Sequence, residues 1–113
     1  MKWLITIFLL CLLFIGCLPT NIPVEFTSLN ELEGFLANDN TSKIVNDKWC
    51  CLDYARCLQS NAVASGRIIN IQVIGEMGEH VINLCIINDV PYFIDPCTDR
   101  IFQLNEITLM PPF

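Results

Sequence analysis

The chain has 113 residues, 53 % of them hydrophobic, with 12 Asp and Glu against 6 Lys and Arg, one His and seven Cys. This length fits one domain, and the excess of acidic residues leaves no basic stripe for a phosphate backbone, so we expect no nucleic-acid partner. An odd number of cysteines also means that disulfides alone cannot account for every thiol.

The amino terminus is typical of an export signal. Lys2 is followed by an apolar stretch over residues 3–15 and then by Gly16 and Cys17. This order matches a secretory signal, and the apolar length is only slightly short of a membrane span. We therefore expect residues 1–18 to be a signal peptide or a membrane anchor, with the remainder extracytoplasmic and either membrane-anchored or secreted.

The sequence FIGC at 14–17 resembles the lipobox of bacterial lipoproteins, in which a small residue precedes a cysteine that becomes lipidated. Phe14 replaces the Leu that is usual there. Lipidation at Cys17, simple cleavage near Cys17 and retention as a membrane anchor are the three alternatives that the sequence leaves open.

Residues 19–27 contain two prolines and no helical pattern, which predicts an extended spacer before a domain over 28–113. A first helix is expected from Ser28, because Ser28 and Glu31 have the spacing of a capping box. Its apolar residues recur at helical spacing, and the polar run at 38–41 ends the pattern.

A second helix is expected to begin near Asn46 or Asp47, where Asp is a good N-cap, and to end at about Ser65 before Gly66. Cys51 would lie in its first turn. The positions that follow Cys51 at helical spacing are apolar or aromatic and form one stripe: Tyr54, Ala55, Leu58 and Ala62. This stripe predicts that the face bearing Cys51 points inward.

Four β-strands are expected after Gly66, at 68–74, 80–87, 90–95 and 101–104, which makes the fold class α+β with N-terminal helices packed on a small antiparallel sheet. If residues 88 and 89 form a two-residue turn, Ile82 faces Asp95 across the hairpin. His80 and Asp95 are then diagonal neighbours on one face of the sheet.

These residues predict a site for nucleophilic catalysis. A thiolate at Cys51 would be stabilised by the open N–H groups and the positive end of the helix dipole. His80 is the single histidine of the chain and would handle the proton, while Asp95 would orient the imidazole.

Three local patterns resemble the transglutaminase-like cysteine superfamily and its small prokaryotic members. CLDYA at 51–55 is similar to the cysteine that starts the core helix, HVIN at 80–83 to the His strand, and YFIDP at 92–96 to the strand that ends in Asp-Pro. The resemblance covers about half the chain. It departs from the family at Ile82, where an aromatic residue is frequent, and at Cys50, where a small polar residue is usual.

The resemblance implies a minimal transglutaminase-like or papain-like core and a cysteine-dependent amide hydrolase or acyltransferase. Cys51 would attack a carboxamide or peptide carbonyl to form a thioester, with His80 handling the proton and Asp95 orienting His80. The backbone N–H of Cys51 and the indole of Trp49 are candidate oxyanion donors. Hydrolysis and transamidation are both open, the expected partner is a peptide, protein or cell-envelope amide, and no cofactor is expected.

Two other functions fit the same residues. One is a non-catalytic transglutaminase-like binding module at the cell surface, and the other is a disulfide-stapled surface protein without a site. We expect no metal site, because no Cys-x-x-Cys pair is present.

The remaining cysteines leave alternatives open. Cys50 and Cys57 are too far apart on one helix to pair. Cys97 would face His80 if the hairpin continued past Pro96, as a resolving partner for Cys51, a structural cysteine or a bystander. Cys50, Cys57, Cys85 and Cys97 otherwise form an even set of disulfide partners or buried thiols.

Overall fold

The computed structural model describes residues 22–75, 77–78 and 80–107. The elements in chain order are α2 (Leu29–Asn38), the 3-10 helix η1 (Thr41–Lys43), α3 (Cys51–Ala64), β1 (Asn70–Ile74), β2 (His80–Ile87), β3 (Val90–Ile94), β4 (Ile101–Phe102) and α4 (Leu104–Ile107). The predicted α+β class, with helices before an antiparallel sheet, is confirmed for this part of the chain. The predicted signal or anchor segment at 1–18, with Cys17, lies outside the described residues.

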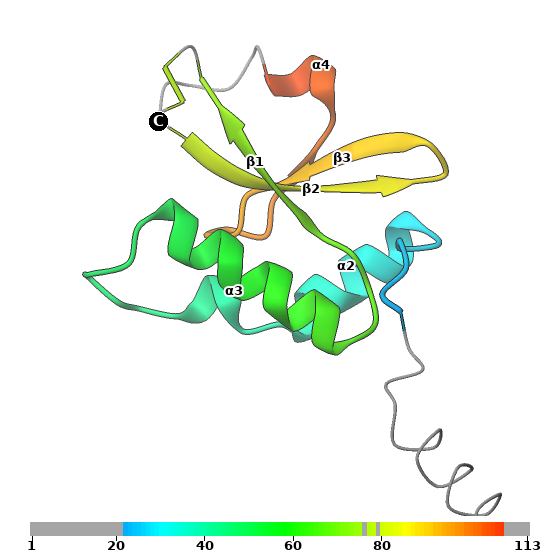
Figure 1. Cartoon of the computed structure of the whole chain (residues 1–113), viewed down its shortest axis with the longest axis horizontal. Coiled ribbons are helices and arrows are strands. Elements are labelled where there is room, and N and C mark those ends of the chain that lie inside the picture. Colours follow the sequence, from blue (N-terminus) through cyan, green and yellow to red (C-terminus); the bar gives the residue numbers. More distant parts are fainter. Residues whose placement is uncertain (1–21, 76, 79, 108–113) are drawn as a thin grey trace, which may run out of the picture.

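The sheet has the order β1-β2-β3-β4, and every neighbouring pair is antiparallel. Helices α2 and α3 lie against one face of this sheet, whereas the short α4 lies on the other side (Figure 1). Within the described part of the chain, no helix has the length and apolar character needed to span a bilayer.

Two apolar clusters hold these layers together. The larger one joins the helices to the sheet through Leu32, Leu36, Leu58, Cys85 and Ile94, among others. The smaller one consists of Ile82, Phe93 and Phe102, and the rings of Phe93 and Phe102 are stacked with centroids 5.9 Å apart. Because neighbouring positions on a strand face opposite sides, β2 and β3 contribute alternate residues to both clusters.

The β2–β3 hairpin has the predicted register. Ile87 pairs with Val90 and Asn83 pairs with Ile94. The two turn residues, Asn88 and Asp89, have φ angles of 51° and 65°. Asn and Asp tolerate this left-handed conformation, which a type I′ turn requires, and so the local sequence sets the register of the two strands.

Helix α2 begins where the sequence predicted, since the Ser28 hydroxyl accepts a 3.1 Å hydrogen bond from the backbone N–H of Glu31. The reciprocal half of the predicted capping box has a different partner. The Glu31 carboxylate accepts from the Thr27 hydroxyl at 2.9 Å and forms an ion pair with Arg67 Nε at 2.6 Å. Glu31 therefore connects the start of α2 to the segment that follows α3.

Helix α3 begins at Cys51 with Cys50 as the N-cap, so the predicted start near Asp47 is wrong. The Asn46 side chain accepts from Lys48 N, and Asn46 O accepts from Trp49 N. Asn46 therefore forms a separate turn, in which its side chain bonds a backbone amide locally and competes with helix formation. The predicted end is confirmed, because Gly66 follows the helix with a φ of +78°.

Several other boundaries differ from the sequence-based expectations. The first and last strands are shorter than predicted, and Leu104 starts the short helix α4 instead of ending a strand. The described part of the predicted spacer also packs on the domain: Phe26 is 3 % exposed within the larger cluster, and Val24 forms a parallel bridge with Arg67. The folded unit therefore includes residues before Ser28.

Candidate active site

Cys51 and His80 lie next to each other. Cys51 Sγ is 3.9 Å from His80 Nδ1, although the two residues are 29 positions apart in the chain. Cys51 is the first residue of α3 and His80 is the first residue of β2, and both side chains are partly buried. The packing of α3 against the sheet therefore brings the beginnings of a helix and a strand together around a thiol and an imidazole.

The segment that leads into Cys51 is fixed by two aromatic residues. The Tyr54 hydroxyl donates a 2.8 Å hydrogen bond to Ile44 O, which ties the first turn of α3 to the preceding loop. The Trp49 ring lies edge-on to Tyr54, with centroids 5.1 Å apart and an interplanar angle of 80°. Trp49 thus has a packing contact two residues before Cys51, and its expected role as an oxyanion donor is not tested by these contacts.

The first turn of α3 is closed by a carboxylate. Asp53 Oδ2 accepts a 2.8 Å hydrogen bond from the backbone N–H of Cys50. This bond, together with the side chain of Cys50, lowers the pKa of Asp53 below its ordinary value. The first N–H groups of a helix have no partner within the helix, and those of Cys51 and Leu52 belong to the turn that carries the thiol.

Asp95 comes directly after β3 and is bound by its own turn. Its Oδ1 accepts a 2.9 Å hydrogen bond from Cys97 N, and its backbone N–H donates to Arg100 O at 2.9 Å. The pairing of β2 with β3 ends at Asn83 and Ile94, so the expected pair of Ile82 with Asp95 is not formed. The chain turns after Asp95, and the hairpin therefore does not continue past Pro96 to bring Cys97 opposite His80. The contact that the structure gives the Asp95 carboxylate, however, is with Cys97.

Cys97 follows Asp95 by two residues, in the turn after β3. The residue is exposed, yet partial burial of its sulfur, the Asp95 carboxylate and the nearby Cys51 sulfur together raise the pKa of the Cys97 thiol to about 11. The structure thus gives two separate contacts, one between Cys51 and His80 and one between Cys97 N and the Asp95 carboxylate.

All five cysteines in the described part of the chain are free: Cys50, Cys51, Cys57, Cys85 and Cys97. Cys85 is 1 % exposed in the larger apolar cluster, and burial, with a smaller effect of Glu25, raises the pKa of its thiol to about 12. Cys85 is thus a core residue, and the candidate disulfide framework of these cysteines is not formed.

A buried amide braces α3 against the sheet below the candidate site. Asn83 is fully buried on β2, and its Nδ2 donates to Ala55 O at 3.0 Å and to Asn70 O at 3.3 Å. Ala55 lies one helical turn after Cys51. The sequence analysis did not single out Asn83, although a polar residue within the run HVINLCII is the signal that marks it.

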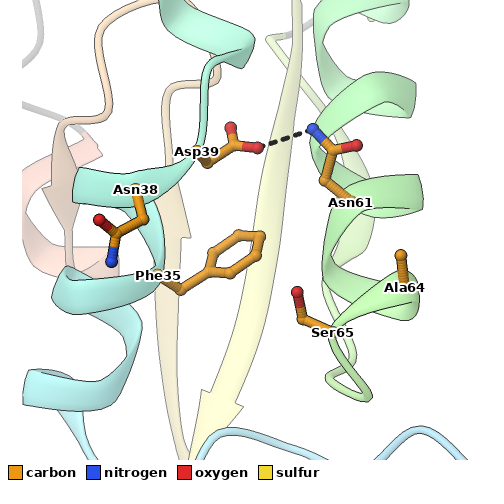
Figure 2. Close-up of a pocket in the computed structure, with 6 residues that line it drawn as sticks. All are labelled: Phe35, Asn38, Asp39, Asn61, Ala64 and Ser65. Carbon is orange, nitrogen blue, oxygen red and sulfur yellow. Dashed lines mark hydrogen bonds between the residues drawn. The ribbon is translucent and has the colours of Figure 1, made fainter.

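A separate pocket of about 300 Å³ lies between α2 and α3, lined by Phe35, Asn38, Asp39, Asn61, Ala64 and Ser65 (Figure 2). Figure 2 shows the Phe35 ring pointing from α2 toward α3, and the Asp39 carboxylate accepting from Asn61. Asn61 follows Cys51 by almost three helical turns, about 15 Å along the axis. This pocket is therefore distinct from the Cys51 site.

The wall of that pocket continues into a polar cluster that the sequence analysis missed. Asn61 Nδ2 donates to Asp39 Oδ1 at 2.7 Å and to Thr41 Oγ1 at 3.2 Å, while Thr41 N donates to Asp39 Oδ2 at 3.0 Å. Thr41 Oγ1 is 3.4 Å from Cys57 Sγ. Both Asp39 oxygens are satisfied, so the cluster joins α2, η1 and α3. No local sequence pattern marks it.

Among residues 22–75, 77–78 and 80–107, no three His, Cys, Asp or Glu side chains are grouped so that they could hold a metal ion.

No family model, curated protein or solved structure matches the chain.

Proposed function

We propose that the chain is an extracytoplasmic, transglutaminase-like cysteine enzyme that acts on carboxamide or peptide bonds through a thioester. The observation that carries the proposal is the 3.9 Å separation between Cys51 Sγ, at the start of α3, and His80 Nδ1. Catalytic hydrogen bonds are frequently long without a substrate and shorten when it binds. A thiol beside an imidazole at a helix amino terminus has the two influences that favour a reactive thiolate.

The proposed reaction has two stages. His80 accepts the Cys51 proton, the sulfur attacks the carbonyl carbon, and the oxyanion that forms is stabilised by the backbone N–H of Cys51. The C–N bond then breaks, and the leaving amine takes the proton from His80, which leaves an acyl thioester on Cys51. Water or a second amine attacks the thioester and releases Cys51, giving hydrolysis or transamidation.

Asp95 is the proposed orienting group for His80, as in a Cys-His-Asp triad. Its bond from Cys97 N competes with that role for one carboxylate oxygen. Asp95 is therefore the member of the triad that the contacts support least. The same contact favours the second candidate function, a non-catalytic binding module that keeps the scaffold without turnover.

The proposed setting follows from the amino-terminal segment and the charge. An export signal or anchor at 1–18, with Cys17 as the lipidation candidate, would hold the domain at the membrane surface. The net charge of −6 suits peptide, protein or envelope substrates that are not polyanions. No cofactor enters this mechanism.

The test uses the full chain in mild detergent, kept reduced, with p-nitrophenyl acetate as an acyl donor and iodoacetamide as a thiol probe. We expect acetyl transfer to Cys51, located by mass spectrometry. Turnover should follow, either by hydrolysis in the buffer or by transfer to an added primary amine. Cys51→Ser should abolish this acylation, and His80→Gln should slow it by about 10²–10⁴-fold. Acetylation at several cysteines with equal slow rates would contradict the proposal.

Cys50 provides a matched control, because it is an exposed thiol directly before Cys51. The Cys50→Ser variant should retain acylation. If it lost acylation as completely as Cys51→Ser, the assignment of the nucleophile to Cys51 would be contradicted. Tight capture of an amide peptide without any thioester would support the binding module instead of the enzyme.

A further inference from the structure

The pocket between α2 and α3 lies where both helices end. Its lining residues come from the last turn and the C-cap of α2, which ends at Asn38, and from the last turn and the C-cap of α3, which ends at Ala64. The last carbonyl groups of a helix have no partner within it and form the negative end of the helix dipole. Neither last turn contains a basic residue that would offset this charge. The pocket is therefore a region of negative potential.

Asp39 adds a carboxylate to this region. The residue lines the pocket although it is only 8 % exposed. Its carboxylate accepts from Asn61 Nδ2 at 2.7 Å and from the backbone N–H of Thr41 at 3.0 Å, and both donors are neutral. Within the described part of the chain, no Lys, Arg or His side chain forms an ion pair with Asp39. A buried carboxylate without a counter-charge is costly, and a cation in the pocket would offset that cost.

An aromatic ring forms another part of the wall. The Phe35 ring is supported by Phe26, with ring centroids 5.6 Å apart and an interplanar angle of 56°. Figure 2 shows the Phe35 ring and the Ser65 hydroxyl extending into the pocket from α2 and from the end of α3. The face of an aromatic ring attracts cations, and its apolar surface accommodates an alkyl chain. The pocket thus combines a carboxylate with an aromatic face, which suits an organic cation.

A bare metal ion fits this pocket less well. Hard cations such as Ca²⁺ take about six to eight oxygen ligands. Asp39 is the one acidic side chain in the lining, and the described residues contain no group of three His, Cys, Asp or Glu that could hold a metal. The volume of about 300 Å³ is at the lower end of the range for small-molecule sites. Charge and size together favour a short organic cation.

We propose that the pocket between α2 and α3 binds the ammonium group of a primary alkylamine. The ammonium group lies against the Asp39 carboxylate, and the alkyl chain lies against the Phe35 ring. The site is independent of the chemistry proposed at Cys51, which is about 15 Å from Asn61 along the axis of α3. A free amine and the lysine side chain of a peptide share this chemistry, and the experiment separates the two sources.

The test titrates the isotope-labelled full chain in mild detergent with n-butylamine and follows the backbone amide signals by NMR. At neutral pH the amine is protonated, and physiological ionic strength screens weak binding to exposed charges. We expect saturable shifts concentrated in residues 35–39 and 61–66. The alcohol n-butanol should give no saturable shifts, because it has the same alkyl chain without the charge.

A second titration uses Nα-acetyl-lysine methylamide, which presents the same ammonium group on a peptide backbone. Saturable shifts in the same residues with either compound support the proposal. Tighter binding of the lysine derivative than of n-butylamine would identify a peptide lysine as the ligand, whereas weaker binding would identify a free amine.

Three variants locate the site. Asp39→Asn removes the charge and should weaken n-butylamine binding by about tenfold or more. Ala64→Leu fills the pocket from an exposed position on α3 without changing any charge, and it should abolish the saturable shifts. Glu33→Gln removes an exposed charge of α2 that does not line the pocket, so this variant should bind as the parent does.

The amide spectrum of each variant without ligand shows whether its fold is intact, so a loss of binding is separated from unfolding. If Asp39→Asn does not fold, Ala64→Leu still decides the question. Equal, non-saturating shifts with n-butylamine and n-butanol would overturn the inference. So would n-butylamine binding that Ala64→Leu leaves unchanged, or saturable shifts concentrated at Cys51 and His80.

Discussion

Asn83 Nδ2 donates a 3.0 Å hydrogen bond to the backbone oxygen of Ala55, so one buried amide connects the central strand β2 to helix α3. Ala55 is one turn from Cys51, and His80 begins the strand that carries Asn83. The separation between the thiol and the imidazole therefore depends on how this amide fixes the helix on the sheet. The buried Oδ1 of Asn83 has no hydrogen-bond partner among the described residues. The Asn83 side chain therefore connects the helix and the sheet through its Nδ2 donor alone.

Replacing Asn83 tests the brace. We expect Asn83→Ala to lower the free energy of unfolding by about 1–3 kcal/mol, because it removes a buried donor from two carbonyl groups. Urea unfolding followed by circular dichroism measures the loss. Asn83→Leu separates hydrogen bonding from volume: it should also destabilise, and a Leu variant as stable as the parent would show that Asn83 only fills space.

The alkaline stability of the protein should depend on Cys85. Burial raises the pKa of its thiol from 9.0 to about 12 in the folded chain, so between these pH values the unfolded chain has lost a proton that the folded chain retains. The contribution of this thiol to the free energy of unfolding is thus fully present below pH 9. It falls as the pH rises toward 12, by at most about 1.4 kcal/mol per pH unit.

Urea unfolding under reducing conditions at increasing pH checks this dependence. Cys85→Ala should flatten the alkaline slope, even though it also lowers stability at neutral pH. Ile87→Val provides the control, because Ile87 is buried on the same strand and carries no titratable group. Ile87→Val should lower the free energy of unfolding by the same amount at every pH. If both variants flattened the alkaline slope equally, Cys85 would not be the group responsible for that slope.

Two glycines should respond in opposite directions to alanine. Gly66 ends α3 with a φ of +78°, so Gly66→Ala is expected to cost about 1–2 kcal/mol, although no atom lies within 4 Å of the added Cβ. Gly34 lies inside α2 with equally open space, so Gly34→Ala should stabilise by about 0.5–1 kcal/mol. Thermal unfolding of both variants tests the pair. If both substitutions changed the free energy of unfolding equally, the backbone conformation of the two glycines would not explain their effects.

The Glu31 carboxylate should make the fold sensitive to acid. Its hydrogen bond from Thr27, and then the charge of Arg67, hold the pKa of Glu31 below its ordinary value of 4.5. A lowered folded pKa means that this stabilisation is present above pH 4.5 and is lost as the pH falls through the folded value.

Glu31→Gln should therefore reduce stability at neutral pH and converge with the parent under acidic conditions, as measured by urea unfolding across that range. Glu33→Gln, an exposed change on the same helix, should leave the acid dependence unchanged. A constant difference between parent and Glu31→Gln at every pH would contradict the electrostatic origin.

The sequence was most informative where a structure is decided within a few residues. Ser28, Gly66 and the pair Asn88 and Asp89 predicted one helix start, one helix end and one strand register correctly. Each of these depends on the preferred backbone angles of a residue or on a hydrogen bond to a near neighbour. The prediction that Asp47 caps α3 used the same rule and was wrong, because Asn46 forms a turn that postpones the helix to Cys51.

The sequence by itself therefore determined the order of the two long helices and the four strands, the hairpin register and the three residue types proposed for catalysis. Only the tertiary structure decided which of these side chains meet. It brought Cys51 within 3.9 Å of His80, directed the Asp95 carboxylate to Cys97, and paired Glu31 with Arg67. Contacts between residues far apart in the chain depend on how the apolar faces of α2 and α3 pack on the sheet, and no local preference encodes that arrangement.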